Sequence, residues 1–212
     1  MSSKNINIKV CGMRDENNIR ELVKINPDYI GFIFYPKSKR FVGENFNLKI
    51  LDYIPERIKK VGVFVKASKE FILEKINMFR LDFIQLHGGE SSEFCRELDS
   101  EGIPVIKAFS VNEEFDFNTI NPFKPYCKYF MFDTQCSTYG GSSTKYNWNI
   151  FSGYDNEKPF FLSGGISDED SDLIRDLKNL NIHAVDINSR FEKEPGLKDI
   201  SKIRKFIKNL KY

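Results

Sequence analysis

Short apolar runs alternate with longer amphipathic stretches along the whole chain. The runs are nearly continuous in apolar residues, which is typical of strands in a parallel sheet that is covered on both faces. We therefore predict strands over residues 6–11, 29–35, 60–65, 82–87, 104–109, 129–133, 159–163 and 183–187.

The stretches between these runs have the spacing of amphipathic helices. A serine stands where three of the helices begin: Ser68, then Ser91 or Ser92, and Ser167. The segments after the second, fifth and sixth strands are less regular and support helices less clearly. The helices are predicted over residues 15–25, 69–79, 92–100, 168–180 and 197–210, the last with an apolar face made of Ile200, Ile203, Phe206, Ile207 and Leu210.

Eight strand–helix units in one chain favour a closed (β/α)₈ TIM barrel of α/β class, which forms one domain over residues 1–212. An open, doubly wound parallel sheet is the alternative, because periodicity alone does not distinguish a closed sheet from an open one. The count of eight units favours closure.

Charge and composition narrow the classes of partner. The 32 lysines and arginines nearly balance 30 aspartates and glutamates, so the charge gives no reason to expect nucleic-acid or membrane binding.

The opening residues MSSKNINIKV lack a signal-peptide core, and no apolar stretch is long enough to span a bilayer. Four cysteines without a C-x-x-C pair, and only two histidines, show no zinc spacing. We expect a cytoplasmic protein without a metal, either a monomer or a homodimer.

Unusual residues follow seven of the predicted strands. In a barrel of this kind the chemistry lies at the carboxyl ends of the strands, so these residues predict a shared pocket. They are Cys11 and Gly12, the segment from Tyr35 to Arg40, Gln85 with His87, Lys107, Asp133, the pair Gly164 and Gly165, and Asp186 followed by Asn188, Ser189 and Arg190.

The pair Gly164 and Gly165 follows the seventh strand and precedes a helix start. Glycines let a ligand approach the backbone closely, and a helix N-terminus offers N–H groups to an anion. Phosphate binding after strands seven and eight is therefore favoured over a simple tight turn.

Asp133 ends an apolar strand and is followed by a loop that contains two glycines. A carboxyl group in a partly apolar pocket can donate a proton near neutral pH, although it could equally cap the next segment or pair with a lysine. The loop 135–144 could close over the site. Gln85 and His87 point the same way from their strand, as a pair that lines a pocket or as a satisfied core pair.

Two further side chains have competing interpretations. Arg40 could hold a carboxylate in a bidentate manner, yet a lone arginine in a lysine-rich loop is more often solvated. Cys11 could serve as a base only if its pKa falls well below the free value of about 8.5. The single cation nearby in sequence is Lys9, on the same face of the strand, and a packed, neutral thiol is the commoner state of a free cysteine.

Six motifs in order resemble the phosphoribosylanthranilate isomerase family over the whole length of the chain. The resemblance implies an aldose–ketose isomerase of tryptophan biosynthesis, which performs the Amadori rearrangement of N-(5-phosphoribosyl)anthranilate to the 1-deoxyribulose 5-phosphate product without a metal or an organic cofactor. The motifs are KVCGMRD, GFIFYPKSKRFV, IQLHGGE, FDT with GGSSTKYNW, FFLSGGIS and VDINSRFEKEPGLKD.

The resemblance also implies roles for individual residues. Cys11 is similar to the family's general base and Asp133 to its general acid, while Arg40 matches the arginine that holds the anthranilate carboxylate. Asp186 matches an aspartate near the substrate hydroxyls. The remaining matches are the pocket residues Gln85 and His87 and the phosphate-binding residues Gly164, Gly165, Asn188 and Ser189.

Two positions depart from the family pattern. Arg190 stands where many members have glycine, and we expect it to add a phosphate contact. Asn147 replaces an aspartate that is structural in the family. The alternatives are another phosphate-binding barrel isomerase and a catalytically silent scaffold; Cys11 argues against the first, and Cys11, Asp133 and Arg40 against the second.

Overall fold

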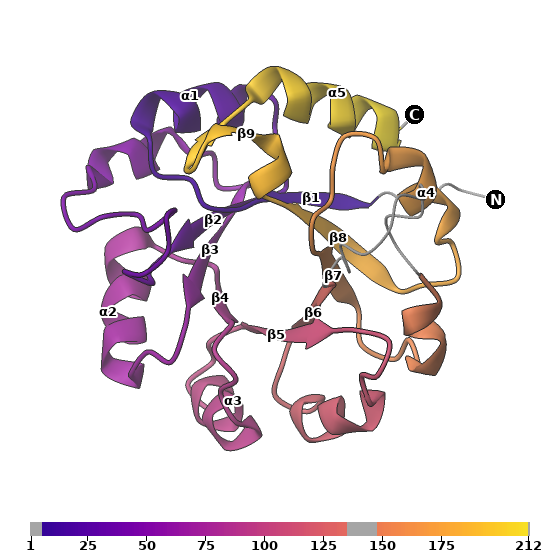
Figure 1. Cartoon of the computed structure of the whole chain (residues 1–212). Coiled ribbons are helices and arrows are strands. Elements are labelled where there is room, and N and C mark those ends of the chain that lie inside the picture. The colour runs from indigo at the N-terminus through magenta and orange to yellow at the C-terminus, as the bar shows by residue number, and fades with distance from the viewer. Residues whose placement is uncertain (1–5, 135–147, 212) are drawn as a thin grey trace.

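The computed structural model describes residues 6–134 and 148–211. Within these residues eight parallel strands close into a barrel, in which each strand pairs with the next and β8 pairs with β1 (Figure 1). The prediction of a closed barrel is thereby confirmed over the open sheet. The strands are β1 (Asn7–Val10), β2 (Tyr29–Ile33), β3 (Lys59–Phe64), β4 (Phe83–Leu86), β5 (Val105–Val111), β6 (Tyr129–Thr134), β7 (Phe160–Ser163) and β8 (Ile182–Ile187).

The inside of the barrel is filled by an apolar cluster that is separate from the larger core under the helices. Its buried members come from β2, β3, β5, β6, β7 and β8: Tyr29, Val61, Ile106, Ala108, Met131, Phe161 and Ala184. Successive side chains in a strand point to opposite faces, so residues two positions further along point inward as well. Asp133 therefore follows Met131 and Asp186 follows Ala184, which puts polar side chains on top of the apolar filling.

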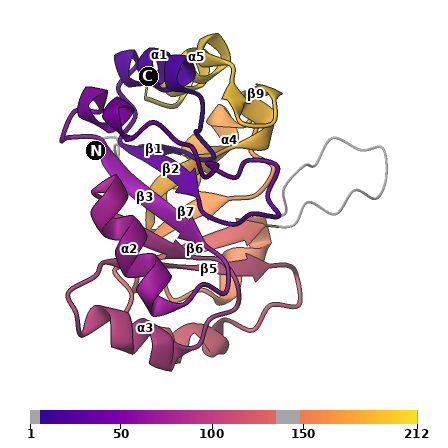
Figure 2. The same ribbon diagram turned by 90° about the vertical axis from the view of Figure 1, so that its left-hand side faces the viewer.

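Helices surround the strands (Figure 2). The α-helices are α1 (Glu16–Lys24), α2 (Lys69–Phe79), α3 (Ser92–Asp99), α4 (Ser171–Asp176) and α5 (Ile200–Lys211). Ser68 and Ser91 cap α2 and α3 with their side chains, as predicted. The irregular segments after β2, β5 and β6 form 3₁₀ turns instead: η1 (Leu48–Tyr53), η2 (Phe117–Phe123) and η3 (Trp148–Gly153). None of the helices in the described residues has the length and apolar content needed to cross a membrane.

The helix after β7 is shorter than predicted and begins at Ser171 instead of 168. The predicted cap, Ser167, does not open it. The backbone N–H and the hydroxyl of Ser167 both donate to Oδ2 of Asp170, at 2.6 and 2.8 Å. This contact makes residues 167–170 a turn that precedes the helix, so the helix N-terminus does not directly follow the glycine pair as we expected.

A small hairpin, which the periodicity did not predict, follows β8. Strand β9 (Glu192–Glu194) pairs antiparallel with β10 (Leu197–Lys198), and a glycine in the left-handed region, Gly196, lies in the turn between them. We predicted that residues 197 and 198 begin the last helix, but α5 begins only at Ile200. The hairpin is too short to show a strand period, and it carries two charged residues, Glu192 and Lys198, to the site end of the barrel.

Candidate active site

The structure brings most of the predicted polar residues together at the carboxyl ends of the strands. Cys11 directly follows β1, and its backbone N–H donates to the carbonyl of Ile187 on β8 at 3.0 Å. The next residue, Gly12, has a φ of 78°, and a side chain there would lie 2.9 Å from Cδ of Arg40 and 3.1 Å from Oδ1 of Asn188. Glycine at this position thus lets Arg40 and Asn188 pack beside the cysteine.

Cys11 is buried, and two lysines act on its thiol. Burial raises the pKa of its thiol, the ammonium groups of Lys9 and Lys198 act to lower it, and the carboxylate of Asp186 acts to raise it. The balance is a raised pKa, which favours the neutral thiol and is opposite to the lowered pKa named above as the condition for a thiolate base. The two cations are nevertheless placed to stabilise a thiolate once the proton leaves.

Lys9 and Asp186 form an ion pair at 3.0 Å in the interior of the barrel. The pair follows from the sheet register, in which Lys9 on β1 lies opposite Asp186 on β8. Although burial disfavours the ammonium ion, Asp186 and Cys11 together raise the pKa of Lys9, so this lysine is charged beside the thiol. The sequence predicts Lys9 and Cys11 on one face of the strand, and the electrostatic influence of each on the other is consistent with that placement.

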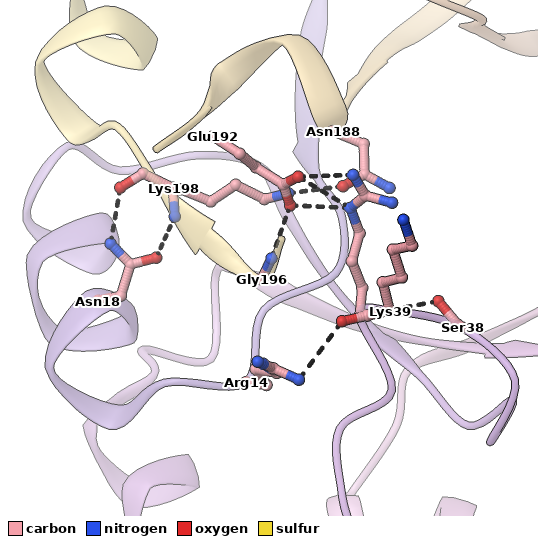
Figure 3. A network of polar contacts seen from close by, with 9 residues as sticks. Arg14, Asn18, Ser38, Lys39, Asn188, Glu192, Gly196 and Lys198 are labelled. Atoms are coloured by element: carbon pink, nitrogen blue, oxygen red, sulfur yellow. Dashed lines mark hydrogen bonds and ion pairs between the residues drawn. The ribbon is translucent and has the colours of Figure 1, made fainter. Parts of the chain in front are cut away.

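Sequence reasoning missed Lys198 as a residue of this site. Its side chain is fully buried, and Nζ donates to Oε1 of Glu192 and to Oδ1 of Asn188, both at 2.6 Å (Figure 3). Burial lowers its pKa, which Glu192 and Cys11 counteract. The only available signal was the segment EPGLKD, whose glycine marks a turn but does not show where the lysine points.

Glu192 binds Arg40 along one edge of the guanidinium group. Arg40 donates from Nε to both carboxylate oxygens, at 2.9 and 3.0 Å, and from Nη2 to Oε2 at 2.6 Å. Burial alone would raise the pKa of Glu192, but Arg40 and Lys198 hold it below its ordinary value. Within the described residues Nη1 of Arg40 makes no hydrogen bond, so the edge formed by Nη1 and Nη2 can receive a second carboxylate.

Gln85, His87 and Asp133 form a continuous polar chain. Oε1 of Gln85 accepts from Nζ of Lys9 at 2.8 Å, and Nε2 of Gln85 lies 3.0 Å from Nδ1 of His87. The other ring nitrogen, Nε2 of His87, lies 3.3 Å from Oδ2 of Asp133. Gln85 and His87 do project to the same side of β4, as predicted, and the chain connects the carboxyl group on β6 with Lys9, whose charge acts on the Cys11 thiol.

The residues proposed for phosphate follow the neighbouring strands β7 and β8. Gly164 and Gly165 have φ values of 107° and 61°, and a side chain on Gly164 would lie 2.6 Å from the backbone nitrogen of Thr134. Asn188 and Ser189 begin the short 3₁₀ turn η4 (Ser189–Phe191) after β8. Arg190 is exposed, and its carbonyl accepts from Nζ of Lys202 at 2.8 Å.

Some predicted features lie outside the described residues, namely the loop 135–144, Cys136 and Asn147. Among residues 6–134 and 148–211 no group of three or more histidine, cysteine, aspartate or glutamate side chains could hold a metal ion. The described site residues offer a thiol, an imidazole, three carboxyl groups and three buried or partly buried cations.

Comparisons with known proteins agree on one family. A family model described as N-(5′-phosphoribosyl)anthranilate (PRA) isomerase matches residues 8–209. The N-(5′-phosphoribosyl)anthranilate isomerase of Parabacteroides distasonis is 45% identical over 204 residues, covering 96% of this chain and 92% of that protein.

Solved structures give the same answer. A phosphoribosylanthranilate isomerase in complex with reduced 1-(o-carboxyphenylamino)-1-deoxyribulose 5-phosphate superimposes with a TM-score of 0.84 at 33% identity, over 97% of this chain and 98% of that one. A structure of monomers generated from the dimeric isomerase of Thermotoga maritima superimposes with a TM-score of 0.82 at 33% identity, over the same shares of the two chains.

Proposed function

Since this chain belongs to the N-(5′-phosphoribosyl)anthranilate isomerase family and is an aldose–ketose isomerase of tryptophan biosynthesis, we propose that Cys11 and Asp133 perform its acid–base chemistry. The substrate is phosphoribosylanthranilate, and the reaction moves protons on the sugar without a metal or an organic cofactor. The observation that carries the proposal is the placement of one thiol and one carboxyl group at the same end of the barrel, where polar contacts join Asp133 to Lys9 and the charge of Lys9 acts on the thiol.

Asp133 is the general acid in this proposal. Its carboxyl group is partly exposed at the end of β6, where a bound substrate can reach it. It protonates the furanose ring oxygen, the bond between that oxygen and C1′ breaks, and the anthranilate nitrogen forms a protonated Schiff base with C1′. The positive charge on the Schiff base makes the hydrogen on C2′ more acidic.

Cys11 is the general base, which in its thiolate form removes that hydrogen from C2′ to give an enolamine. The enolamine then tautomerises to the ketone product. Because burial raises the pKa of the thiol, Cys11 first gives its proton to water, and the charges of Lys9 and Lys198 then stabilise the thiolate. The cationic Schiff base lowers the strength that the base needs, so a cysteine is sufficient.

Substrate binding uses the surrounding residues. The free edge of Arg40 holds the anthranilate carboxylate while Glu192 fixes the opposite edge. Phosphate lies on the backbone N–H groups around Gly164, Gly165, Asn188 and Ser189, with the guanidinium group of Arg190 as an additional contact. Asp186 lies near the substrate hydroxyls, next to Lys9.

Complementation of a tryptophan auxotroph that lacks this isomerase tests the assignment. Wild-type protein should restore growth, whereas Cys11→Ala and Asp133→Ala should not. Cys95→Ala, which removes another buried thiol from α3, is the matched control and should support growth. Growth with Cys11→Ala or Asp133→Ala equal to that with wild type would defeat the proposed roles.

We further propose that residues 1–212 act as one barrel domain in the cytoplasm, as a monomer or a homodimer. The relation to a family of biosynthetic enzymes supports a cytoplasmic location. The Thermotoga maritima relative, which is described as dimeric, supports the homodimer. Sedimentation of the purified protein distinguishes the two states.

A further inference from the structure

Four side chains from three strands form a line across the site: Lys9 on β1, Gln85 and His87 at the end of β4, and Asp133 on β6. Their successive contacts are 2.8, 3.0 and 3.3 Å long. Lys9 and Gln85 are fully buried, so neither can exchange its partner for water. Each contact restricts the orientation of the next group along the line.

Lys9 determines which way the amide of Gln85 points. A lysine ammonium group has three donors and no acceptor, so the atom that faces it must be the amide oxygen. The carboxyl group of Asp186, 3.0 Å away, and the raised pKa of Lys9 favour the protonated ammonium group. The amide nitrogen of Gln85 therefore faces the imidazole ring of His87.

The amide nitrogen in turn determines the tautomer of His87. An amide nitrogen can only donate, so Nδ1 of His87 has to accept. A neutral imidazole has one acceptor and one donor, which puts its single proton on Nε2. Nε2–H then points at Oδ2 of Asp133, which accepts.

We propose that Gln85, held by Lys9, is a positioning residue that keeps His87 in the Nε2–H tautomer, so that Oδ1 of Asp133 is the atom that carries the acid proton. This inference rests on the proposed function, because it takes Asp133 as the general acid. With Oδ2 occupied by a donor from His87, a proton on the carboxyl group has to sit on Oδ1.

The same contact bears on a second proton on the ring of His87. A second ring proton on Nδ1 would face the N–H groups of Gln85 and would have no acceptor. A charged imidazolium beside Asp133 would favour the ionised carboxylate and oppose proton donation. Gln85 thus supports the acid role of Asp133 without touching the carboxyl group itself.

Nitrogen NMR of protein labelled with ¹⁵N-histidine tests the tautomer directly. The chain has two histidines, so a His183→Gln variant assigns both rings. Near pH 7 we expect His87 to show a protonated Nε2 and an unprotonated Nδ1. In Gln85→Glu the new carboxylate still accepts from Lys9 and can also accept from Nδ1–H, so Nδ1 should become protonated.

As a control, the same change from an amide to a carboxylate is made beside the ring of His183. Nδ2 of Asn7 lies 3.5 Å from Nε2 of His183, and Asn7→Asp should move the signals of His183 and leave those of His87 in place. For the catalytic effect, kcat of Gln85→Glu should fall roughly 10- to 100-fold with little change in KM. Gln85→Met, which removes the amide without adding charge, should give a mixture of tautomers and a smaller loss of kcat.

Different results would contradict the inference about His87 and the proposed roles of Cys11 and Asp133. An Nδ1–H tautomer or a doubly protonated ring of His87 in the wild-type protein near pH 7 overturns the inference and leaves the roles of Cys11 and Asp133 intact. An unchanged kcat in both Gln85 variants overturns it as well. An active Asp133→Ala enzyme would instead defeat the proposed function, whichever tautomer the spectrum shows.

Discussion

Glu192 holds one edge of the Arg40 guanidinium group with hydrogen bonds of 2.6 to 3.0 Å, although the two residues are 152 positions apart in the chain. The same carboxylate accepts from the buried Lys198 and from the backbone N–H of Gly196. Glu192 is therefore the group through which the arginine proposed for substrate binding is connected to the lysine beside Cys11.

Replacing Glu192 by glutamine should weaken substrate binding more than it slows turnover. A neutral amide cannot hold the arginine edge with two charge-assisted bonds, so Arg40 loses its fixed orientation. We expect KM to rise roughly tenfold, which corresponds to about 1.4 kcal/mol, while kcat changes less. Glu194→Gln, an exposed change in the same strand, is the control. A larger effect on kcat than on KM would show that Glu192 acts on the chemistry instead.

Replacing Lys198 by methionine should move the titration of Cys11 to higher pH. Burial raises the pKa of the Cys11 thiol and Lys198 acts to lower it, so the removal of Lys198 should raise that pKa further. The thiolate absorbs in the ultraviolet, and the difference in absorbance between each protein and its Cys11→Ala counterpart isolates this one thiol. Lys202→Met removes a partly exposed lysine that contacts Asp168 and should leave the titration unchanged. A downward shift in Lys198→Met would contradict the prediction.

Arg190→Gly should weaken substrate binding. The side chain is exposed after β8, beside the proposed phosphate residues, where a guanidinium group can make a charge-assisted contact. We expect KM to rise several-fold with kcat nearly unchanged, and the rise should shrink at high salt because an exposed contact is screened. An unchanged KM at low salt would rule out the phosphate contact.

Gly164→Ala should be strongly destabilising, through backbone strain and through a steric clash. Gly43→Ala introduces the backbone strain alone and so separates the two causes. Both glycines have a φ in the left-handed region, 107° and 89°, which costs an alanine of order 1–3 kcal/mol. A side chain at Gly43 would meet no atom within 4 Å, whereas one at Gly164 would meet the backbone of Thr134 at 2.6 Å.

Urea unfolding of both variants measures the difference. The free energy of unfolding should fall by no more than the backbone cost in Gly43→Ala and by clearly more in Gly164→Ala, because the strand end β6 has to move. Equal losses would mean that the close approach of the two backbones contributes nothing to stability.

Much of the site was accessible to sequence reasoning because parallel strands place their carboxyl ends on one rim. Cys11, Gln85, Asp133 and Asp186 follow from that rule alone once the strands are located. The rule did not predict Lys198 as a site residue, because its strand has two residues and is too short to show the alternation of apolar and polar positions. It also misplaced the start of α4, where the side chain of Asp170 bonds back to Ser167 and forms a turn.

The sequence by itself determined the alternation of strands and helices, the closed barrel that the alternation favours, and the set of polar residues at the strand ends, because these depend on local periodicity. Only the tertiary structure decided which charges meet. Barrel closure brings Lys9 to Asp186 across 177 positions and to Gln85 across 76. Burial then raises the pKa of Cys11, and the Gln85 amide is the group that we propose sets the tautomer of His87. Protonation depends on solvent exclusion and on neighbouring charges, and neither can be read from residues that are adjacent in the chain.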